Sequence, residues 1–357
     1  MIEYYAAYIL IFMLPILLSK IKLKNKTKTL CTWYFFILFT LFGFRHQSMG
    51  IDLGYGSFYG YLGQFTEIAS FSWKQVFTED VVNYERGYIV FNKLISLISD
   101  DPQFLLICCA FVSIYPIFYM IYKKSVSPTF SLSIYMGLPV FMLLFSGLRQ
   151  NIAIGICFCS ILFIQERKLG KFLLCVLVAS CFHSTAWIFL MAYPVYHVKL
   201  GPSLRKLTIP ALAAVYMLRY PIFYIVGRLF KDNPIADHNG AISLFLVFVL
   251  IYVFEVLYMD RSEEENGLLN IFYIACCAQA IGGVYSTVLR IGYYFMTSLI
   301  LLLPLVIQRI NRRKDALLLK VLIAVCFVTF GLYSIRNSTW AQAYPYYWMW
   351  NDINYIR

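Results

Sequence analysis

Long, uninterrupted apolar segments recur along the whole chain, and they restrict what it can fold into more than any other feature. Most are 15 to 22 residues long, with short basic stretches between them, and a helix needs roughly 20 apolar residues to cross a bilayer. Charged residues make up only 13% of the 357 residues, whereas soluble domains contain about 25%. We therefore predict an all-α polytopic integral membrane protein. An outer-membrane β-barrel is excluded, because its strands alternate in polarity over about 10 residues.

The apolar segments predict about 12 transmembrane helices, with a range of about 10 to 14 because several segments are shorter than a full span. Together they make the whole chain, 1–357, a single transmembrane domain. Two adjacent segments, 171–183 and 184–198, are the least clearly separate spans, because they form either a tight hairpin or one helix. The other segments fall at 2–18, 30–44, 103–122, 130–147, 150–165, 207–226, 240–258, 267–288, 291–307 and 316–335.

Basic residues in the connecting loops predict the orientation of the chain. With the N-terminus outside, 19 of the 30 basic residues lie on the cytoplasmic side, as the positive-inside rule requires. The net charge of +12 then follows from topology, so no nucleic acid partner is expected. The cytoplasmic basic stretches are 20–28, 123–124, 167–171, 199–206, Arg261 and 309–320.

The kind of basic residue differs between the two predicted sides. Inside there are 13 Lys and 6 Arg, whereas outside and at the outer helix ends there are 8 Arg and 3 Lys. Guanidinium groups bind phosphate and carboxylate oxygens in pairs, and ammonium groups do not. An anion site on the outer face is one explanation; chance and snorkelling of long side chains toward the interface is the other.

Two stretches outside the apolar segments are predicted on the outer face. The extracytoplasmic loop 45–101 has apolar residues at helical spacing over 58–68 and 88–98, which predicts amphipathic helices lying on the membrane surface. The extracytoplasmic tail 336–357 is rich in Trp and Tyr. This composition is typical of an aromatic belt at the interface, and a carbohydrate-stacking surface is the alternative.

Arg149 and Arg290 both stand at the outer junction of two apolar segments. A charge so close to hydrocarbon is costly and should face a cavity or a partner. The two arginines therefore indicate a shared anion site, with separate snorkelling as the alternative.

Three titratable residues are predicted on the same face, and each is a candidate catalytic base. His183 ends one apolar segment, while Glu85 and Asp52 lie in the long loop. A lone His in an apolar segment is more often structural, and no hydrolase, ATPase or metalloprotease motif accompanies it.

The stretch 100–102, Asp-Asp-Pro, is explained more simply by a helix cap than by a metal-diphosphate site. All ten cysteines lie in apolar segments, so neither a disulfide framework nor a zinc site is expected.

Five short strings follow one another along the chain: 45–52, Glu85 to Tyr88, Leu148 to Gln150, Phe182 to Ser184, and Arg290 followed by Tyr293, Tyr294 and Phe295. The strings and their order resemble the pattern of the EpsG/Wzy-type polysaccharide polymerases. The resemblance runs from about residue 45 to 305, with an echo at Tyr344-Pro345-Tyr346. One departure is Leu53-Gly54-Tyr55, where the family more often has an acidic residue followed closely by Tyr.

The resemblance implies a membrane-embedded glycosyltransferase with a bundle like the GT-C fold. It would polymerise undecaprenyl-diphosphate-linked oligosaccharide units into O-antigen, capsular or exopolysaccharide at the outer leaflet of the bacterial cytoplasmic membrane. Its partners would be the lipid-linked donor and acceptor, membrane lipid and a chain-length regulator, and no metal or other cofactor is required. The implied diphosphate and substrate contacts are Arg149, Arg290, Arg45, Gln150, Tyr293 and Tyr294, and the implied catalytic candidates are His183, Glu85 and Asp52.

Two other functions use similar features. A flippase or other transporter for lipid-linked oligosaccharides also binds a diphosphate, but the chain has no convincing internal repeat, and transporters are often built from two related halves. An O-antigen ligase uses the same donor at the same face and stays open as an alternative.

Overall fold

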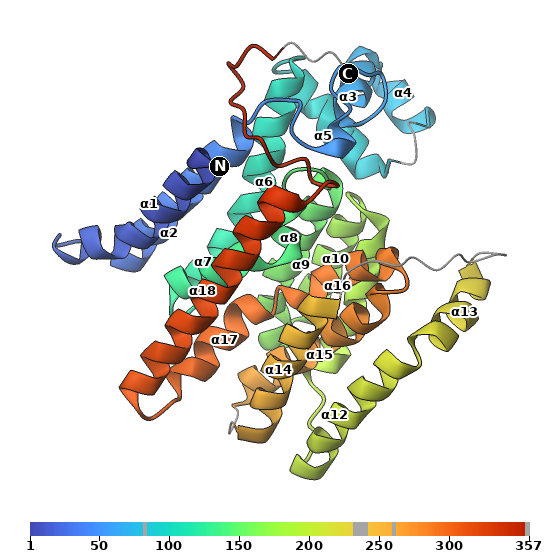
Figure 1. Cartoon of the computed structure of the whole chain (residues 1–357). Coiled ribbons are helices and arrows are strands. Elements are labelled where there is room, and N and C mark those ends of the chain that lie inside the picture. Colours follow the sequence, from blue (N-terminus) through green and yellow to red (C-terminus); the bar gives the residue numbers. More distant parts are fainter. Residues whose placement is uncertain (81–83, 231–241, 259–261, 354–357) are drawn as a thin grey trace.

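The computed structural model describes residues 1–80, 84–230, 242–258 and 262–353, and every regular element in them is a helix. The prediction of an all-α protein is therefore confirmed. The long helices form a bundle, with the short helices of the 45–101 loop and the C-terminal tail gathered at one end (Figure 1).

The predicted apolar segments reappear as helices or as broken pairs of helices. Unbroken ones are α1 (Ile2–Ser19), α2 (Lys26–Gly43), α6 (Pro102–Lys124), α9 (Leu148–Gln165), α10 (Leu169–Ser180), α14 (Ile242–Tyr258), α15 (Glu263–Gly282) and α18 (Arg313–Asn337). Broken pairs are α7 (Pro128–Gly137) with α8 (Pro139–Met142), η2 (Ser184–Met191) with α11 (Ala192–Tyr196), α12 (Pro202–Met217) with α13 (Arg219–Phe230), and α16 (Ser286–Met296) with α17 (Leu299–Gln308). Residues 240 and 241 of one segment lie outside the described residues.

Fewer helices than predicted are long enough to cross a membrane. In the described ranges, α1, α6, α9 and α18 have the length and apolar character of a span. Two bent pairs, α12–α13 at 67° and α16–α17 at 48°, raise the number to six if each pair is one span. The protein is thus a multi-pass membrane protein with four to six candidate spans, and the count of about 12 is not shown. The helix is interrupted between α7 and α8 just before Pro139, because the residue before a proline disfavours helical backbone. Irregular backbone at membrane depth is tolerated where protein buries it.

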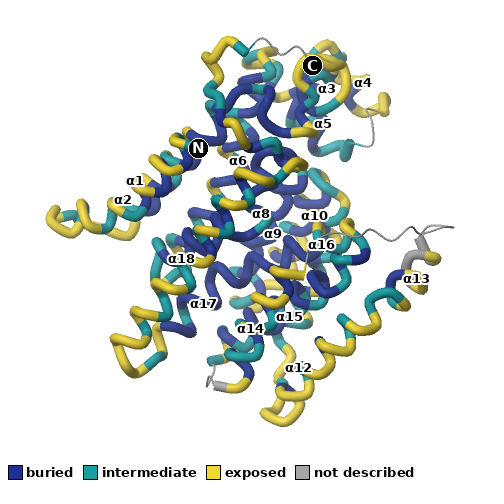
Figure 2. Tube along the Cα trace, in the orientation of Figure 1, coloured by how far each residue is buried: buried dark blue, intermediate teal, exposed yellow. Residues whose placement is uncertain are grey.

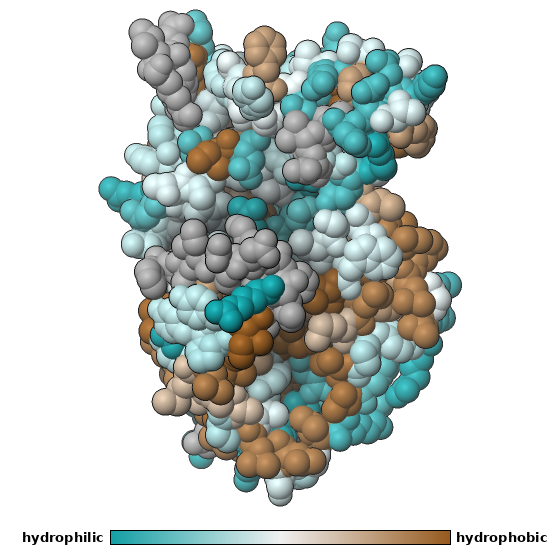
Figure 3. All heavy atoms as spheres, turned by 90° about the vertical axis from the view of Figure 1, so that its right-hand side faces the viewer, coloured by the Kyte–Doolittle hydropathy of each residue, from teal (hydrophilic) through white to brown (hydrophobic). Residues whose placement is uncertain are grey.

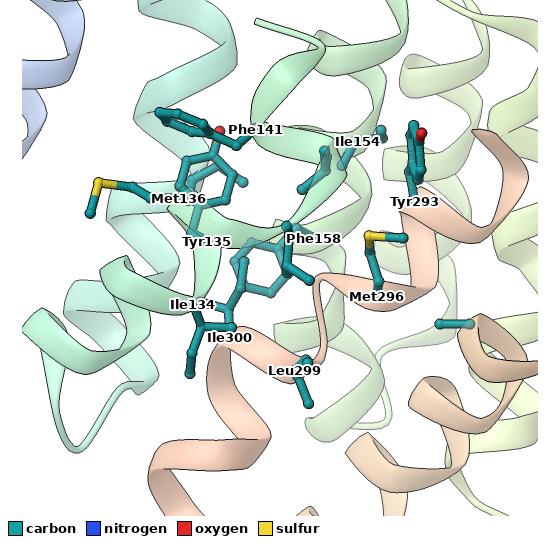
Figure 4. Packing of buried hydrophobic residues seen from close by; sticks show 14 of the residues in the cluster. Ile134, Tyr135, Met136, Phe141, Ile154, Phe158, Tyr293, Met296, Leu299 and Ile300 are labelled. Atoms are coloured by element: carbon teal, nitrogen blue, oxygen red, sulfur yellow. The ribbon is translucent and has the colours of Figure 1, made fainter. Parts of the chain in front are cut away.

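Helix α9 lies in the buried centre of the bundle. Figure 2 shows the buried residues concentrated there and in α16 and α17, while α12 and the far ends of α1 and α2 are largely exposed. Figure 4 shows Phe158 of α9 among Tyr135 of α7, Met296 of α16 and Ile300 of α17, all of which are buried. This packing fixes the start of α9, where Arg149 lies, and it fixes α16, which carries Arg290 within its length.

The cap predicted at 100–102 is confirmed. The Asp101 side chain accepts a hydrogen bond from the backbone N–H of Gln103 at 2.8 Å, and Pro102 occupies the first turn of α6. A carboxylate at this position satisfies one of the free N–H groups at a helix start.

The long loop forms helices, as predicted, and part of each apolar face packs against the bundle. The loop contains η1 (Ile51–Leu53), α3 (Tyr61–Ser70), α4 (Trp73–Thr78) and α5 (Arg86–Ser96). Phe65 of α3 and Tyr88 of α5 are fully buried in one cluster with Leu105 of α6 and Ile152 of α9. Helices α6 and α9 thus cover these side chains, whereas Ile98 of the same predicted face is 77% exposed. Contact of the remaining apolar surface with a membrane stays a prediction.

The C-terminal tail folds back over the same end of the bundle. Tyr346 Oη donates a hydrogen bond to the carbonyl of Leu41 at 2.8 Å, and Arg45 and Trp348 form an isolated antiparallel bridge. The rings of Trp348 and Trp350 stack at 5.1 Å between centroids. Residues 354–357 of the predicted tail lie outside the described residues.

The basic stretches between helices lie away from the loop and the tail. Helix α18 begins at Arg313 and ends where the tail starts, and α6 begins after the loop and ends at Lys123 and Lys124. Arg167 and Lys199 both pair with Glu263, with N···O distances of 3.2 and 3.4 Å. Arg261 lies outside the described residues.

Figure 3 shows polar side chains over the upper part of one face and apolar ones gathered below. Which side faces the cytoplasm stays a prediction.

We expect Asp80→Cys to react with a membrane-impermeant maleimide on intact cells, and Lys24→Cys to react only after permeabilisation. Both side chains are exposed, and the positive-inside rule places them on opposite sides. Cys181 and Cys326, the exposed cysteines of the described chain, are replaced by Ser in both variants. Labelling of Asp80→Cys only from the cytoplasm would contradict the predicted orientation.

Candidate active site

Glu85 is the centre of a polar cluster that joins three distant parts of the chain. Its Oε2 pairs with Nη1 of Arg149, and its Oε1 accepts a hydrogen bond from the backbone N–H of Ser184 at 2.7 Å. His183 Nδ1 lies 3.4 Å from Oε1, which is within ion-pair distance but longer than an ordinary hydrogen bond. The Glu85 and Arg149 side chains are each only 16% exposed. Three of the predicted site residues thus form one cluster.

A close approach between α5 and the turn after α10 brings this cluster together. Glu85 precedes the first turn of α5, and the N–H of Tyr88 donates to the carbonyl of Cys181 at 3.1 Å. A Cβ at Gly87 would stand 2.6 Å from that carbonyl oxygen. Only glycine therefore allows the turn carrying His183 to lie against α5. Sequence reasoning quoted Gly87 in a motif but gave it no role.

The surroundings of Glu85 keep its carboxylate ionised. Burial acts to raise its pKa, but the nearby His183 ring, the hydrogen bond from the Ser184 amide and the charge of Arg149 together lower the pKa to about 2. A carboxylate with so low a pKa is a weak base near neutral pH. The geometry therefore favours a positioning role for Glu85, toward both Arg149 and His183.

Two tyrosines from the long loop hold the Arg149 guanidinium. Its Cζ lies 4.4 Å from the ring centroid of Tyr84 and 5.9 Å from that of Tyr61, and these two rings stack at 5.7 Å. Arg149 Nε donates to Tyr61 Oη at 3.4 Å. Cation–π contacts of this kind fix the plane of the guanidinium. The sequence showed Tyr61 only as part of an apolar helix face, and it gave no signal for Tyr84.

A cavity of about 500 Å³ lies beside this cluster, and we call it the polar cavity. Asp52 is exposed in it, and burial raises the pKa of Asp52 while Arg290 and Arg149 act to lower it. A carboxylate and two guanidinium groups thus face one space. The predicted residues among its lining are Asp52, Arg149, Gln150, His183 and Arg290.

A second cavity, of about 970 Å³, adjoins the first, and we call it the large cavity. It lies between α8, α14, α15, α16 and the end of α18, and Leu143, Leu289 and Phe330 contribute to its apolar lining. His183 and Arg290 line both cavities. These two residues therefore stand at the boundary between a charged space and a larger, more apolar one.

Arg290 is the basic residue best placed to meet an anion. Its side chain is exposed to both cavities, and no carboxylate of the described chain lies within ion-pair distance of it. Gln150 Nε2 donates to the Arg290 carbonyl at 2.8 Å, which ties the start of α9 to α16. Gln150 thus positions Arg290 as well as lining the polar cavity.

The remaining predicted residues are placed differently from one another. Tyr293 lines the large cavity. Tyr294 is fully buried outside both cavities, with its Oη 3.1 Å from Oγ1 of Thr185. In the described residues, no group of three or more His, Cys, Asp or Glu side chains is placed to hold a metal ion.

Arg45 lies outside both cavities, which corrects its predicted position at the diphosphate. Its side chain is 1% exposed, and it donates to the carbonyls of Phe42 at 2.6 Å, Phe145 at 3.2 Å and Met49 at 3.3 Å. Each of the three guanidinium nitrogens thus donates a hydrogen bond to a backbone carbonyl. Arg45 joins the end of α2 to the start of the loop and to the residues that precede α9.

We expect Arg45→Met to destabilise the protein by about 2 kcal/mol or more, because the substitution leaves buried carbonyls without donors. Thermal unfolding in detergent measures the loss. Arg336→Met, at an exposed arginine near the same end of the bundle, serves as the control and should change little. An Arg45→Met protein as stable as wild type would show that these three bonds do not hold the loop.

The bundle and its cavities define a multi-pass membrane protein with a basic, polar site at one end of its helices. The sequence profile of the EpsG family matches residues 28–348, and the chain therefore belongs to the EpsG family. The predicted family is confirmed, and membership associates the protein with polysaccharide biosynthesis at a membrane. No curated protein and no solved structure shows significant similarity to the chain.

Proposed function

We propose that this protein is a polysaccharide polymerase that transfers a growing glycan from undecaprenyl diphosphate to a sugar hydroxyl of a new lipid-linked unit. The reaction takes place at the outer leaflet of the bacterial cytoplasmic membrane. The observation that carries the proposal is that His183 and Arg290 line both the polar and the large cavity. A base and a cation at such a boundary suit a reaction between a lipid diphosphate and a sugar.

The diphosphate is the leaving group, so the site must stabilise the negative charge that develops on it. Arg290 supplies a guanidinium with no carboxylate at ion-pair distance in the described part of the chain. Arg149 supplies a second, oriented by Tyr61 and Tyr84 and partly neutralised by Glu85. Arg290 is therefore the primary diphosphate contact, and Arg149 supports it from the polar cavity.

The acceptor hydroxyl must lose a proton as it attacks. His183 faces both cavities, and its Nδ1 points at the ionised Glu85. A carboxylate 3.4 Å from Nδ1 favours the tautomer with its hydrogen on Nδ1, which leaves Nε2 to accept the proton. The acceptor oxygen bonds to the anomeric carbon, the bond from that carbon to the diphosphate oxygen breaks, and the diphosphate takes the electron pair. Asp52 is the second candidate base, because it is exposed in the polar cavity.

The large cavity suits the isoprenoid part of the lipid carrier. Its apolar side chains, among them Met142, Leu244 and Leu289, come from helices of the bundle, and it meets the polar cavity at Arg290. A chain that enters between these helices can place its diphosphate at the boundary with the sugars in the polar cavity.

Gel analysis of surface polysaccharide from a deletion strain tests the function. Loss of a polymerase leaves single repeat units on the lipid carrier or on the lipid A core. Loss of a flippase leaves no units outside, and loss of a ligase leaves long polymers on the carrier with none transferred. Only the first pattern supports the proposal.

A further inference from the structure

A third cavity, of about 450 Å³, lies at the opposite end of α18 from the candidate active site. Arg313, the first residue of α18, lines this cavity, whereas Tyr333 near the helix end lines the large cavity. A helix of 25 residues is about 37 Å long, so the two sites are separate. The third cavity lies where α7 begins, α17 ends and α18 begins, and we call it the basal cavity.

The basal cavity is positively charged. Arg313 and Lys320 both line it from α18, and a spacing of seven residues places them on one face of the helix. No Asp or Glu is among its lining residues, and neither cation has a carboxylate within ion-pair distance in the described ranges. Lys320 is half-buried, with its Nζ 5.9 Å from the ring centroid of Phe130. Partly burying an ammonium without a counter-charge is costly, and an anion in the cavity would offset that cost.

Neutral hydrogen-bonding groups complete the polar wall. Ser127 at the start of α7, Gln308 at the end of α17 and Asn311 in the turn before α18 line the cavity beside the two cations. Hydroxyl and amide groups of this kind donate to phosphate oxygens. The polar wall thus combines two positive charges from α18 with donors at the start of α7 and the end of α17.

The same cavity opens onto an apolar strip. Leu317 lines the cavity and is 60% exposed, and Val321 and Val325 follow it along α18 at 51% and 55% exposure. The buried floor is apolar as well, with Phe130 and Ile307. A ligand with a phosphate head and hydrocarbon chains matches this arrangement, whereas a free phosphate would leave the strip unused.

We propose that the basal cavity binds the headgroup of an anionic phospholipid, of the phosphatidylglycerol class. Arg313 and Lys320 hold the phosphate, and the acyl chains lie along Leu317, Val321 and Val325. Basic pockets between transmembrane helices commonly bind acidic headgroups. Because the lipid contacts α7, α17 and α18 together, its binding stabilises the folded bundle. The proposal does not depend on the reaction at the other end.

The full-length protein in a neutral detergent provides the test. Its unfolding temperature is measured with phosphatidylglycerol, with phosphatidylcholine of the same acyl chains, and with inorganic phosphate. Phosphatidylglycerol should raise the unfolding temperature by several degrees, and the other two should not. Arg313→Gln with Lys320→Gln should weaken binding about tenfold or more, because both charge-assisted contacts are lost.

Two further variants keep the result interpretable. Arg312→Gln with Lys314→Gln removes the same charge from the neighbouring positions, which do not line the cavity, and it should respond like wild type. Lys320→Arg keeps the cation and should retain the preference for phosphatidylglycerol. Lipid retained on the folded protein, counted by native mass spectrometry, gives a second readout if the double Gln variant unfolds early. Equal stabilisation of the two double variants, or by phosphatidylcholine, would overturn the proposal, and stabilisation by inorganic phosphate alone would overturn the lipid assignment.

Discussion

Replacing Arg290 by Lys should reduce polymer formation by about 10- to 100-fold, although the charge is kept. Arg290 has no carboxylate partner in the described chain and lines both cavities. A compact ammonium does not reproduce the paired contact of a guanidinium with diphosphate oxygens. Hydrogen bonds to charged groups contribute about 1.5 to 3 kcal/mol, and about 1.4 kcal/mol corresponds to a tenfold change.

The measurement is polymer length and yield in membranes that contain matched amounts of each variant. Arg336→Lys is the control, because Arg336 is exposed near the same end of the bundle and lines neither cavity. Arg149→Lys should lose most activity too, since it breaks the contacts with Glu85 and Tyr84. Polymer of wild-type length and yield from Arg290→Lys would mean that Arg290 only extends toward the membrane–water interface and does not bind the diphosphate.

Replacing His183 by Gln should lower the rate by about 100-fold or more, because Gln keeps some hydrogen bonding but accepts no proton at the reacting oxygen. Asp52→Asn should keep most of the activity if His183 is the base. Glu85→Gln should lower the rate less than His183→Gln, since Glu85 acts through Arg149 and His183. The three variants are compared in detergent with one defined lipid-linked substrate, over a range of pH.

Either of two results would reverse this assignment. If Asp52→Asn is inactive while His183→Gln polymerises at nearly the wild-type rate, the aspartate is the base and the histidine is structural. If Glu85→Gln alone is inactive, with its unfolding temperature unchanged, the carboxylate acts directly on the substrate in spite of its lowered pKa.

Much of the fold was predictable, because hydrophobic segments and caps are local properties. The apolar residues around α1, α6, α9 and α18 predicted these helices. The sequence Asp-Asp-Pro predicted that Asp101 caps the start of α6. The number of spans was not predictable in the same way. Whether a short apolar helix such as α10 crosses a membrane or lies buried inside the bundle depends on packing, which the sequence of one segment does not reveal.

The candidate site was predictable in its residues more than in its roles. Arg149, Glu85 and His183 were expected on one face, and the structure joins them in one cluster. Arg45 looked equivalent to the other arginines, but its partners are backbone carbonyls, which a sequence does not display. Tyr84 was missed because a cation–π contact across distant segments leaves no local pattern.

The central claim is that this protein elongates a lipid-linked glycan, and reconstitution tests it most directly. The purified full-length protein is placed in liposomes with one defined undecaprenyl-diphosphate-linked repeat unit, and the products are separated by size. The account predicts a ladder that grows by one repeat unit per step, with release of undecaprenyl diphosphate, and no ladder with Arg290→Lys combined with His183→Gln. Movement of the unelongated substrate across the bilayer, with no ladder and no released carrier, would contradict it.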